Sequence, residues 1–207
     1  MEESASHRNA AKDEASFLLE YDPKMTVREA RELYFERSGF SDATYSNTWV
    51  KLPMGPINFY MPNVEGRRVC VPLHDVDHIV TGYPTSYRGE FAIGGFEIGS
   101  GCGPFFFGWL INSQAMLAGS IVFPSTTFHG FVRGRRCTDN VFRKKLDQLL
   151  DLEVGALREQ LQLDVNTRPP AGADRLAYAG ALAITFFGHL AALGLPVFAL
   201  LLLMGVL

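Results

Sequence analysis

Cysteine is scarce in this chain of 207 residues. The three cysteines, Cys70, Cys102 and Cys137, are an odd number, lie far apart and include no C-x-x-C pair. This pattern argues against a disulfide framework and against a zinc site made of thiolates. Three isolated thiols are typical of a protein in a reducing compartment.

An excess of basic charge is also missing. The formal net charge is -3 and the pI is near 5.9, which argues against nucleic acid as a partner. The N-terminal residues have no apolar stretch of the kind found in a signal peptide, and they contain too many acids for a transit peptide. We expect residues 1–14 to be a disordered lead, in a bacterial protein.

Charge is absent from the end of the chain. Residues 176–207 contain no Asp, Glu, Lys or Arg, and a membrane-spanning helix needs about 20 such residues. A buried core helix is the alternative, although few core helices are apolar on every face. We predict a transmembrane anchor at 176–207 after a linker at 166–175. Arg168 and Arg175 before the anchor favour a domain on the cytoplasmic face of the bacterial inner membrane.

The remaining residues, 15–165, predict one compact all-α domain. Thr26 and Glu29 form a capping-box pattern that starts a helix ending near Gly39. Apolar residues three and four apart predict a long helix over 139–163, whereas the prolines of 51–63 predict an extended, irregular segment. A second uncharged run, 101–127, is expected to be a buried or membrane-touching helix rather than a second span.

The residues with the clearest chemistry follow Pro72, which predicts a short helix over 73–81. His74 and His78 then lie at positions i and i+4 on one face, a spacing that brings two imidazoles to one metal ion. An early position in the helix disfavours protonated histidine, which keeps the nitrogen lone pairs available. Asp75 is adjacent, as a ligand, as an acceptor that orients a ligand, or as a proton carrier.

Glu90 is the expected carboxylate partner of the two histidines. Thr85 or Ser86 can cap a second helix that contains Glu90 and folds it back over the histidine face. Two imidazoles with one or two carboxylates suit Zn best, with Fe, Mn and Co as further options. Glu97 lies seven residues later on the same face, where it could move protons. The alternative is a pair of solvated histidines without a metal.

Two surfaces suggest contact with lipid. The glycines of 89–101 give the Glu90 helix a low profile against which an isoprenoid tail or another helix could pack. Basic residues in 133–145 are interleaved with phenylalanine, as on a surface that meets anionic headgroups; a solvated basic face is the alternative. This cluster comprises Arg133, Arg135, Arg136, Arg143, Lys144 and Lys145.

The spacing H-D-x-x-H-x(11)-E, from His74 to Glu90, resembles the signature of the coenzyme Q biosynthesis protein 4 family. The surrounding PLHDVDHIVTGYPTSYRGE and the later LREQLQLD are similar to family segments, so the resemblance covers about residues 45–164. It implies an all-helical fold, a metal held by His74, Asp75, His78 and Glu90, and attachment to an energy-transducing membrane. The C-terminal hydrophobic anchor and the Phe-rich 84–137 region depart from the better-known members, as in a bacterial side branch.

The resemblance also implies a role in ubiquinone biosynthesis with polyprenylated benzoquinone precursors. One expected activity is oxidative decarboxylation at ring C1, with Asp75 or Glu97 moving protons. The alternative is a non-catalytic, lipid-binding scaffold that organises other quinone-biosynthesis proteins at the membrane. A homodimer is an additional option, and a membrane-anchored domain without metal is a third interpretation.

Overall fold

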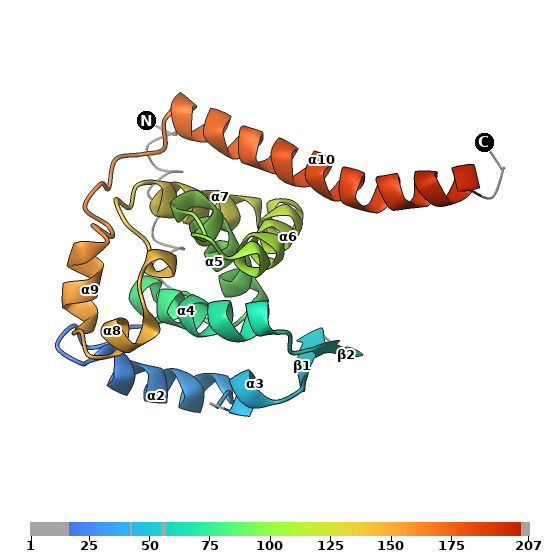
Figure 1. The fold of residues 1–207 in the computed structure, drawn as a ribbon. Helices are drawn as coiled ribbons and strands as arrows, with labels where there is room; N and C mark the ends of the chain where they lie inside the picture. The colour runs from blue at the N-terminus through green and yellow to red at the C-terminus, as the bar shows by residue number, and fades with distance from the viewer. Residues whose placement is uncertain (1–16, 42, 55–56, 204–207) are drawn as a thin grey trace.

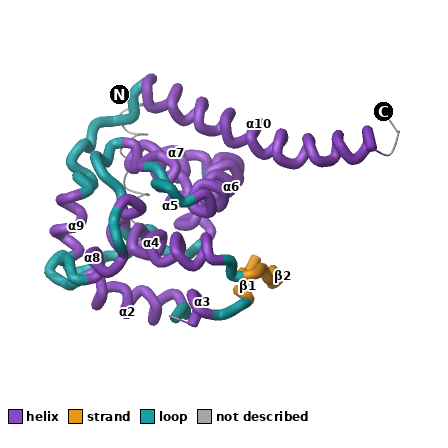
Figure 2. The backbone as a smooth tube through the Cα atoms, viewed as in Figure 1, coloured by secondary structure: helices purple, strands orange, loops and turns teal. Residues whose placement is uncertain are grey.

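The computed structural model describes residues 17–41, 43–54 and 57–203, and it confirms an all-α fold with one small hairpin (Figures 1 and 2). The expected lead at 1–14 lies outside the described residues. The elements, in chain order, are α2 (Val27–Ser38), α3 (Ala43–Ser46), β1 (Trp49–Met54), β2 (Ile57–Pro62), α4 (Glu65–Thr81), α5 (Tyr87–Ser100), α6 (Phe106–Val122), α7 (Pro124–Arg135), the 3₁₀ turn η1 (Val141–Arg143), α8 (Leu146–Leu150), α9 (Val154–Gln160) and α10 (Gly172–Leu203).

Helix α4 lies at the centre of the domain, between α2 on one side and α5, α6 and α7 on the other (Figure 1). Its apolar residues Leu73, Val76, Ile79 and Val80 are buried in the main hydrophobic core. Burial of four such side chains contributes on the order of 1.5–3 kcal/mol each. The helix that carries both histidines is therefore one of the best-anchored elements of the fold.

Helix α2 begins and ends as predicted. The Thr26 side chain accepts from the backbone N–H of Glu29, the Glu29 carboxylate accepts from the N–H of Thr26, and Gly39 ends the helix with a positive φ of 72°. Each such cap contributes about 1 kcal/mol.

The expected helix over 139–163 is wrong, because this segment forms η1, α8 and α9 instead. The chain between α8 and α9 makes backbone hydrogen bonds with the start of α2: Val27 N–H donates to the Leu152 carbonyl, and Val154 N–H donates to the Met25 carbonyl. Backbone groups used in this way cannot also form helical bonds. Tertiary pairing thus outweighs the helical periodicity of the sequence.

The proline-containing segment is extended, as predicted, but it is not irregular. β1 and β2 pair as an antiparallel hairpin in which Trp49 lies opposite Pro62. Pro62 occupies the end of its strand, a position where a missing N–H removes little from the ladder.

Helices α5 and α7 pack backbone against backbone. A Cβ added at Gly95 would lie 2.4 Å from the Thr127 carbonyl oxygen, and one added at Gly134 would lie 2.0 Å from the Phe96 carbonyl oxygen. Only glycine permits so close an approach. The expected glycine surface is therefore covered at Gly95 by a neighbouring helix, α7.

Helix α10 begins at Gly172, inside the expected linker, and its first half lies along α6 and α7 before it extends past the domain (Figure 1). Tyr178 and Leu182 pack against a small core formed by Met116, Phe131 and Val132. Gly172–Ala192 is long and apolar enough to cross a membrane, and its most apolar window is not buried in the fold. This agrees with an anchor by length and composition.

Candidate metal centre

Three side chains converge between the end of α4 and the start of α5. Nε2 of His74 and Nε2 of His78 lie 3.1 Å apart, and a Glu90 carboxylate oxygen lies 3.6 Å from each of them. One ligand atom from each residue lies within 4.8 Å of the others. The structure thus brings together three of the four predicted metal ligands, and this group could hold a metal ion.

The other nitrogen of each imidazole has an acceptor beside it. His78 Nδ1 lies 2.8 Å from the carbonyl oxygen of Tyr83, and His74 Nδ1 lies 2.7 Å from Oε1 of Glu97. A carbonyl or carboxylate oxygen can only accept, so we assign the hydrogen of each ring to Nδ1. In neutral rings each Nε2 then presents a lone pair to the other, and either a metal ion or a proton on His74 can lie between them.

The helix that carries the histidines is longer than predicted. α4 begins at Glu65, so Pro72 lies inside it and not in its first turn. The missing N–H of Pro72 removes one helical hydrogen bond, and the buried apolar face of α4 offsets this cost. His78 consequently lies in the last turn, where the helix dipole favours a cation. The dipole argument for neutral histidines is therefore wrong, although their i, i+4 placement on one helix is confirmed.

A tight turn carries the chain from α4 to Glu90. Gly82 ends α4 with a φ of 78°, and its N–H donates to the His78 carbonyl. Ser86 then caps α5 by accepting from the N–H of Gly89, which confirms one of the two predicted caps and places Glu90 in the first turn. The positive end of the α5 dipole favours a carboxylate there.

Charge concentrates at this group. Burial lowers the pKa of His74, but the carboxylates of Glu97 and Glu90 outweigh burial and raise that pKa well above its usual value. Burial raises the pKa of Glu90, but the histidines outweigh burial and hold it well below its usual range. The two carboxylates around His74 therefore favour a positive charge at the Nε2 atoms.

Glu97 lies on the Nδ1 side of the His74 ring, whereas Glu90 lies on the Nε2 side. Its side chain is fully buried, its Oε1 accepts from His74, and its Oε2 accepts from the Asn112 side chain on α6. This placement makes Glu97 a positioning residue for the imidazole. Its direct part in proton transfer stays a prediction.

The Asp75 carboxylate faces two tyrosine hydroxyls and does not join the other three predicted ligands. Its carboxylate accepts hydrogen bonds from the hydroxyl groups of Tyr34, at 2.9 Å, and Tyr45. The ring of Tyr34 in turn stacks on the imidazole of His78, with centroids 5.7 Å apart. Burial raises the pKa of the Asp75 carboxyl above its usual value. Of its predicted roles, the structure shows Asp75 as a hydrogen-bond acceptor beside the site.

Asp77 and Asn112 are the polar residues that the sequence reasoning missed. Asp77 is almost fully buried, neither of its carboxylate oxygens has a hydrogen-bond partner within the described part of the chain, and burial followed by the charge of Glu97 raises its pKa well above the usual value. The signal for Asn112 was present, since it is a polar residue in the middle of an apolar run.

The arginines of the expected basic surface on α7 are mostly engaged within the protein. Arg133 makes a two-pronged ion pair with Asp164, and Arg135 and Arg136 both pair with Asp174 at the start of α10. They fix the segment that leads to α10. These three arginines therefore do not form a freely solvated face.

Comparisons of the chain with protein-family models, with curated proteins and with solved structures found no match. The class that fold and site define is a helical protein with a candidate two-histidine, one-carboxylate metal centre. Membership of the coenzyme Q biosynthesis protein 4 family stays a prediction that depends on the spacing from His74 to Glu90.

Proposed function

We propose that this protein binds one divalent transition metal ion through Nε2 of His74, Nε2 of His78 and the carboxylate of Glu90. The observation that carries the proposal is the pair of Nε2 atoms, 3.1 Å apart and each 3.6 Å from a Glu90 oxygen. Two such acceptors and a carboxylate repel one another unless a cation or a proton lies among them. Nitrogen and oxygen donors suit Zn, with Fe, Mn or Co as further options.

The number of ligands favours an enzyme. Structural zinc sites are usually closed by four protein ligands, whereas catalytic sites keep a position open. The cluster holds three, because the Asp75 carboxylate is bonded to two tyrosine hydroxyls. The Glu90 side chain is 37% exposed, so an external molecule can reach the ion from that side.

We further propose that the substrate is a polyprenylated benzoquinone precursor of ubiquinone and that the reaction is oxidative removal of its C1 carboxyl group. In this reaction the carboxyl leaves as CO₂, water supplies the ring hydroxyl, and dioxygen accepts two electrons and two protons as hydrogen peroxide. Support comes from the resemblance of the His74–Glu90 spacing to the coenzyme Q biosynthesis protein 4 family. A bound ion would supply Lewis acidity toward the ring carboxylate. Glu97 and the Tyr83 carbonyl orient the two imidazoles, and Asp75 with Tyr34 provides a proton-holding pair beside His78.

The same proposal places the domain at the cytoplasmic face of the bacterial inner membrane, anchored by α10, with other quinone-biosynthesis proteins as partners. Support comes from the length and apolar composition of α10 and from the outer face of α6, where Phe106, Trp109, Ile121 and Val122 are exposed. Large apolar side chains exposed beside an apolar helix are typical of contact with lipid.

Elemental analysis of purified variants tests the metal proposal. We expect about one transition-metal ion per wild-type chain and loss of most of it in His78→Ala, because removing a ligand leaves only two. His189→Ala is the matched control, since His189 lies on α10 and bonds the Thr185 carbonyl. Stoichiometric metal in a folded His78→Ala protein would exclude the site.

Mass spectrometry of copurifying lipids and an assay of ring-carboxyl release test the substrate. A wild-type protein that holds metal and prenylated quinone precursor but releases no CO₂ would favour the scaffold role over the enzyme.

A further inference from the structure

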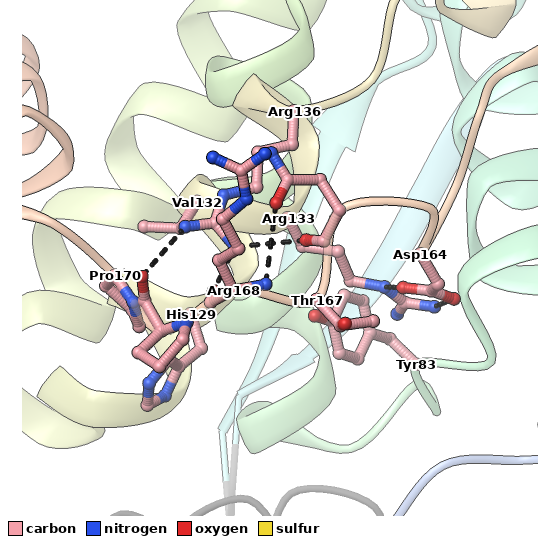
Figure 3. A pocket seen from close by; sticks show the side chains of 11 residues that line it. Tyr83, His129, Val132, Arg133, Arg136, Asp164, Thr167, Arg168 and Pro170 are labelled. Carbon is pink, nitrogen blue, oxygen red and sulfur yellow. Dashed lines mark hydrogen bonds and ion pairs between the residues drawn. The ribbon is translucent and has the colours of Figure 1, made fainter.

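A cavity separate from the metal centre opens where the chain leaves the domain for α10 (Figure 3). Its volume is about 280 Å³, and it lies between α7, the loop after α4 and the segment 164–170. His74, His78 and Glu90 do not line it. Tyr83 is the link between the two places, because it lines the cavity and its carbonyl oxygen faces His78 Nδ1.

Positive charge predominates around this cavity. Arg133, Arg136 and Arg168 line it, with Asp164 as the acidic lining residue. Figure 3 shows Arg133 joined to Asp164, a carboxylate that Arg158 also contacts at 3.1 Å.

The second carboxylate near the cavity is also shared. Asp174 pairs with Arg136, at 3.1 Å, and with Arg135, at 2.7 Å. Four guanidinium groups thus share two carboxylates, and Arg168 lines the cavity as a fifth cation, so these seven groups carry an excess of three positive charges. An anion in the cavity would offset part of that excess.

Arg168 is the cation with hydrogen-bond donors to spare. Among the described residues, no carboxylate lies within ion-pair distance of its guanidinium. The backbone at Arg168 is fixed, since its carbonyl accepts from Arg136 at 2.5 Å. Thr167, the preceding residue, also lines the cavity and adds a hydroxyl group. Phosphate oxygens in proteins commonly accept hydrogen bonds from guanidinium and hydroxyl groups.

We propose that this cavity binds the phosphate of an anionic phospholipid headgroup, held by Arg168 and Thr167 within the positive field of Arg133 and Arg136. The lipid as source rests on the proposed membrane attachment of α10, which begins two residues after the last lining residue, Pro170. Leu176 and Ile184 are exposed apolar side chains on the first part of α10. They favour contact of this side of the domain with the bilayer surface, where anionic lipids attract basic residues.

Native mass spectrometry of the full chain in detergent tests the proposal, with short-chain phosphatidylglycerol, phosphatidylcholine and inorganic phosphate as probes. We expect wild type to bind one phosphatidylglycerol in preference to phosphatidylcholine. The double variant Arg168→Gln with Thr167→Val should bind it about tenfold more weakly, because the charged hydrogen bonds to the phosphate are lost. Arg175→Gln is the matched control, since Arg175 is exposed, carries the same charge and does not line the cavity.

Equal weakening in Arg175→Gln and in the double variant would mean that bulk charge alone attracts the lipid, which overturns the proposal. Binding of inorganic phosphate without any binding of phosphatidylglycerol would overturn the lipid assignment and identify a soluble phosphate compound. Metal content measured on the same samples keeps the two sites apart: it should be unchanged in the double variant, and a wild type without metal but with bound phosphatidylglycerol would refute only the metal proposal.

Discussion

At the scale of single residues, the metal centre depends on which nitrogen of each imidazole carries a hydrogen. Two partners decide this, the Tyr83 carbonyl for His78 and the Glu97 carboxylate for His74. The first partner is backbone and survives most substitutions. The second is a side chain, so a substitution at Glu97 can change the orientation of the His74 ring.

We predict that Glu97→Gln lowers metal affinity by about 10–100-fold without unfolding the protein, as is typical of residues that orient a metal ligand. The amide oxygen can still accept from His74 Nδ1, but the negative charge that favours a cation is lost. Competition with a chelator measures the change. Glu36→Gln, at an exposed position on α2, is the control, and an affinity equal to wild type in Glu97→Gln would show that His74 needs no carboxylate behind it.

Spacing in the sequence was sufficient to find the convergence of His74, His78 and Glu90, because helical geometry fixes the first two and a capped turn returns the third. It was not sufficient for Asp75. Its partners Tyr34 and Tyr45 lie 41 and 30 positions away. No local sequence pattern predicts that hydroxyl groups so far away will bond to Asp75 and turn it from the metal ligands.

At the scale of elements, α5 is held in place by glycines on α7. Gly130 and Gly134 bring the α7 backbone against the carbonyls of Ala92 and Phe96 on the helix that also carries Glu90. The distance between these helices is therefore set by the absence of side chains, and it determines where Glu90 lies relative to α4.

We predict that Gly134→Ala lowers the free energy of unfolding by about 1–3 kcal/mol, because its Cβ would lie 2.0 Å from the Phe96 carbonyl oxygen and the helices must separate. Urea denaturation followed by circular dichroism in detergent measures this. Gly180→Ala is the matched control, since nothing lies within 4 Å of its Cβ on α10, and it should be neutral or stabilising by up to about 1 kcal/mol. The same result for both variants would refute the close packing.

Helix limits were predictable where local chemistry marks them, as at the Thr26–Glu29 box and at Ser86. They were not predictable where distant backbone intervenes. The long helix expected over 139–163 is interrupted where Leu152 and Val154 bond to the start of α2. The nearest glycine, Gly155, lies inside α9 and does not mark the interruption.

At the scale of the whole molecule, α10 has two parts. Its first part covers a small core through Ala177, Tyr178, Ala181 and Leu182 and is fixed by Asp174, whereas its later part extends past the domain (Figure 1). A cut within the first part would expose Met116 and Phe131, so the anchor should be removed beyond it.

We predict that truncation after Thr185 releases a folded domain from the membrane fraction, because the remaining α10 residues are too few to span a bilayer. Fractionation of cells followed by immunoblotting measures this. A protein truncated after Asp174 is the comparison, and it should be less stable, since the cover of Phe131 is lost. Membrane association that persists after the cut at Thr185 would assign attachment to the exposed α6 face instead.

The backbone bonds between the start of α2 and the α8–α9 connection also bear on the order in which the chain can fold. The Arg28–Asp151 ion pair, which accompanies them, joins residues 123 positions apart. At a synthesis rate of about 5–20 residues per second, α2 waits roughly 6–25 s on the ribosome before its partner exists. During that interval α2 can pack on α4, which is made earlier, but the start of α2, with Val27 later fully buried, stays open to chaperones and proteases. Among the described elements, α2 is thus the first made, and its start is among the last segments to be secured.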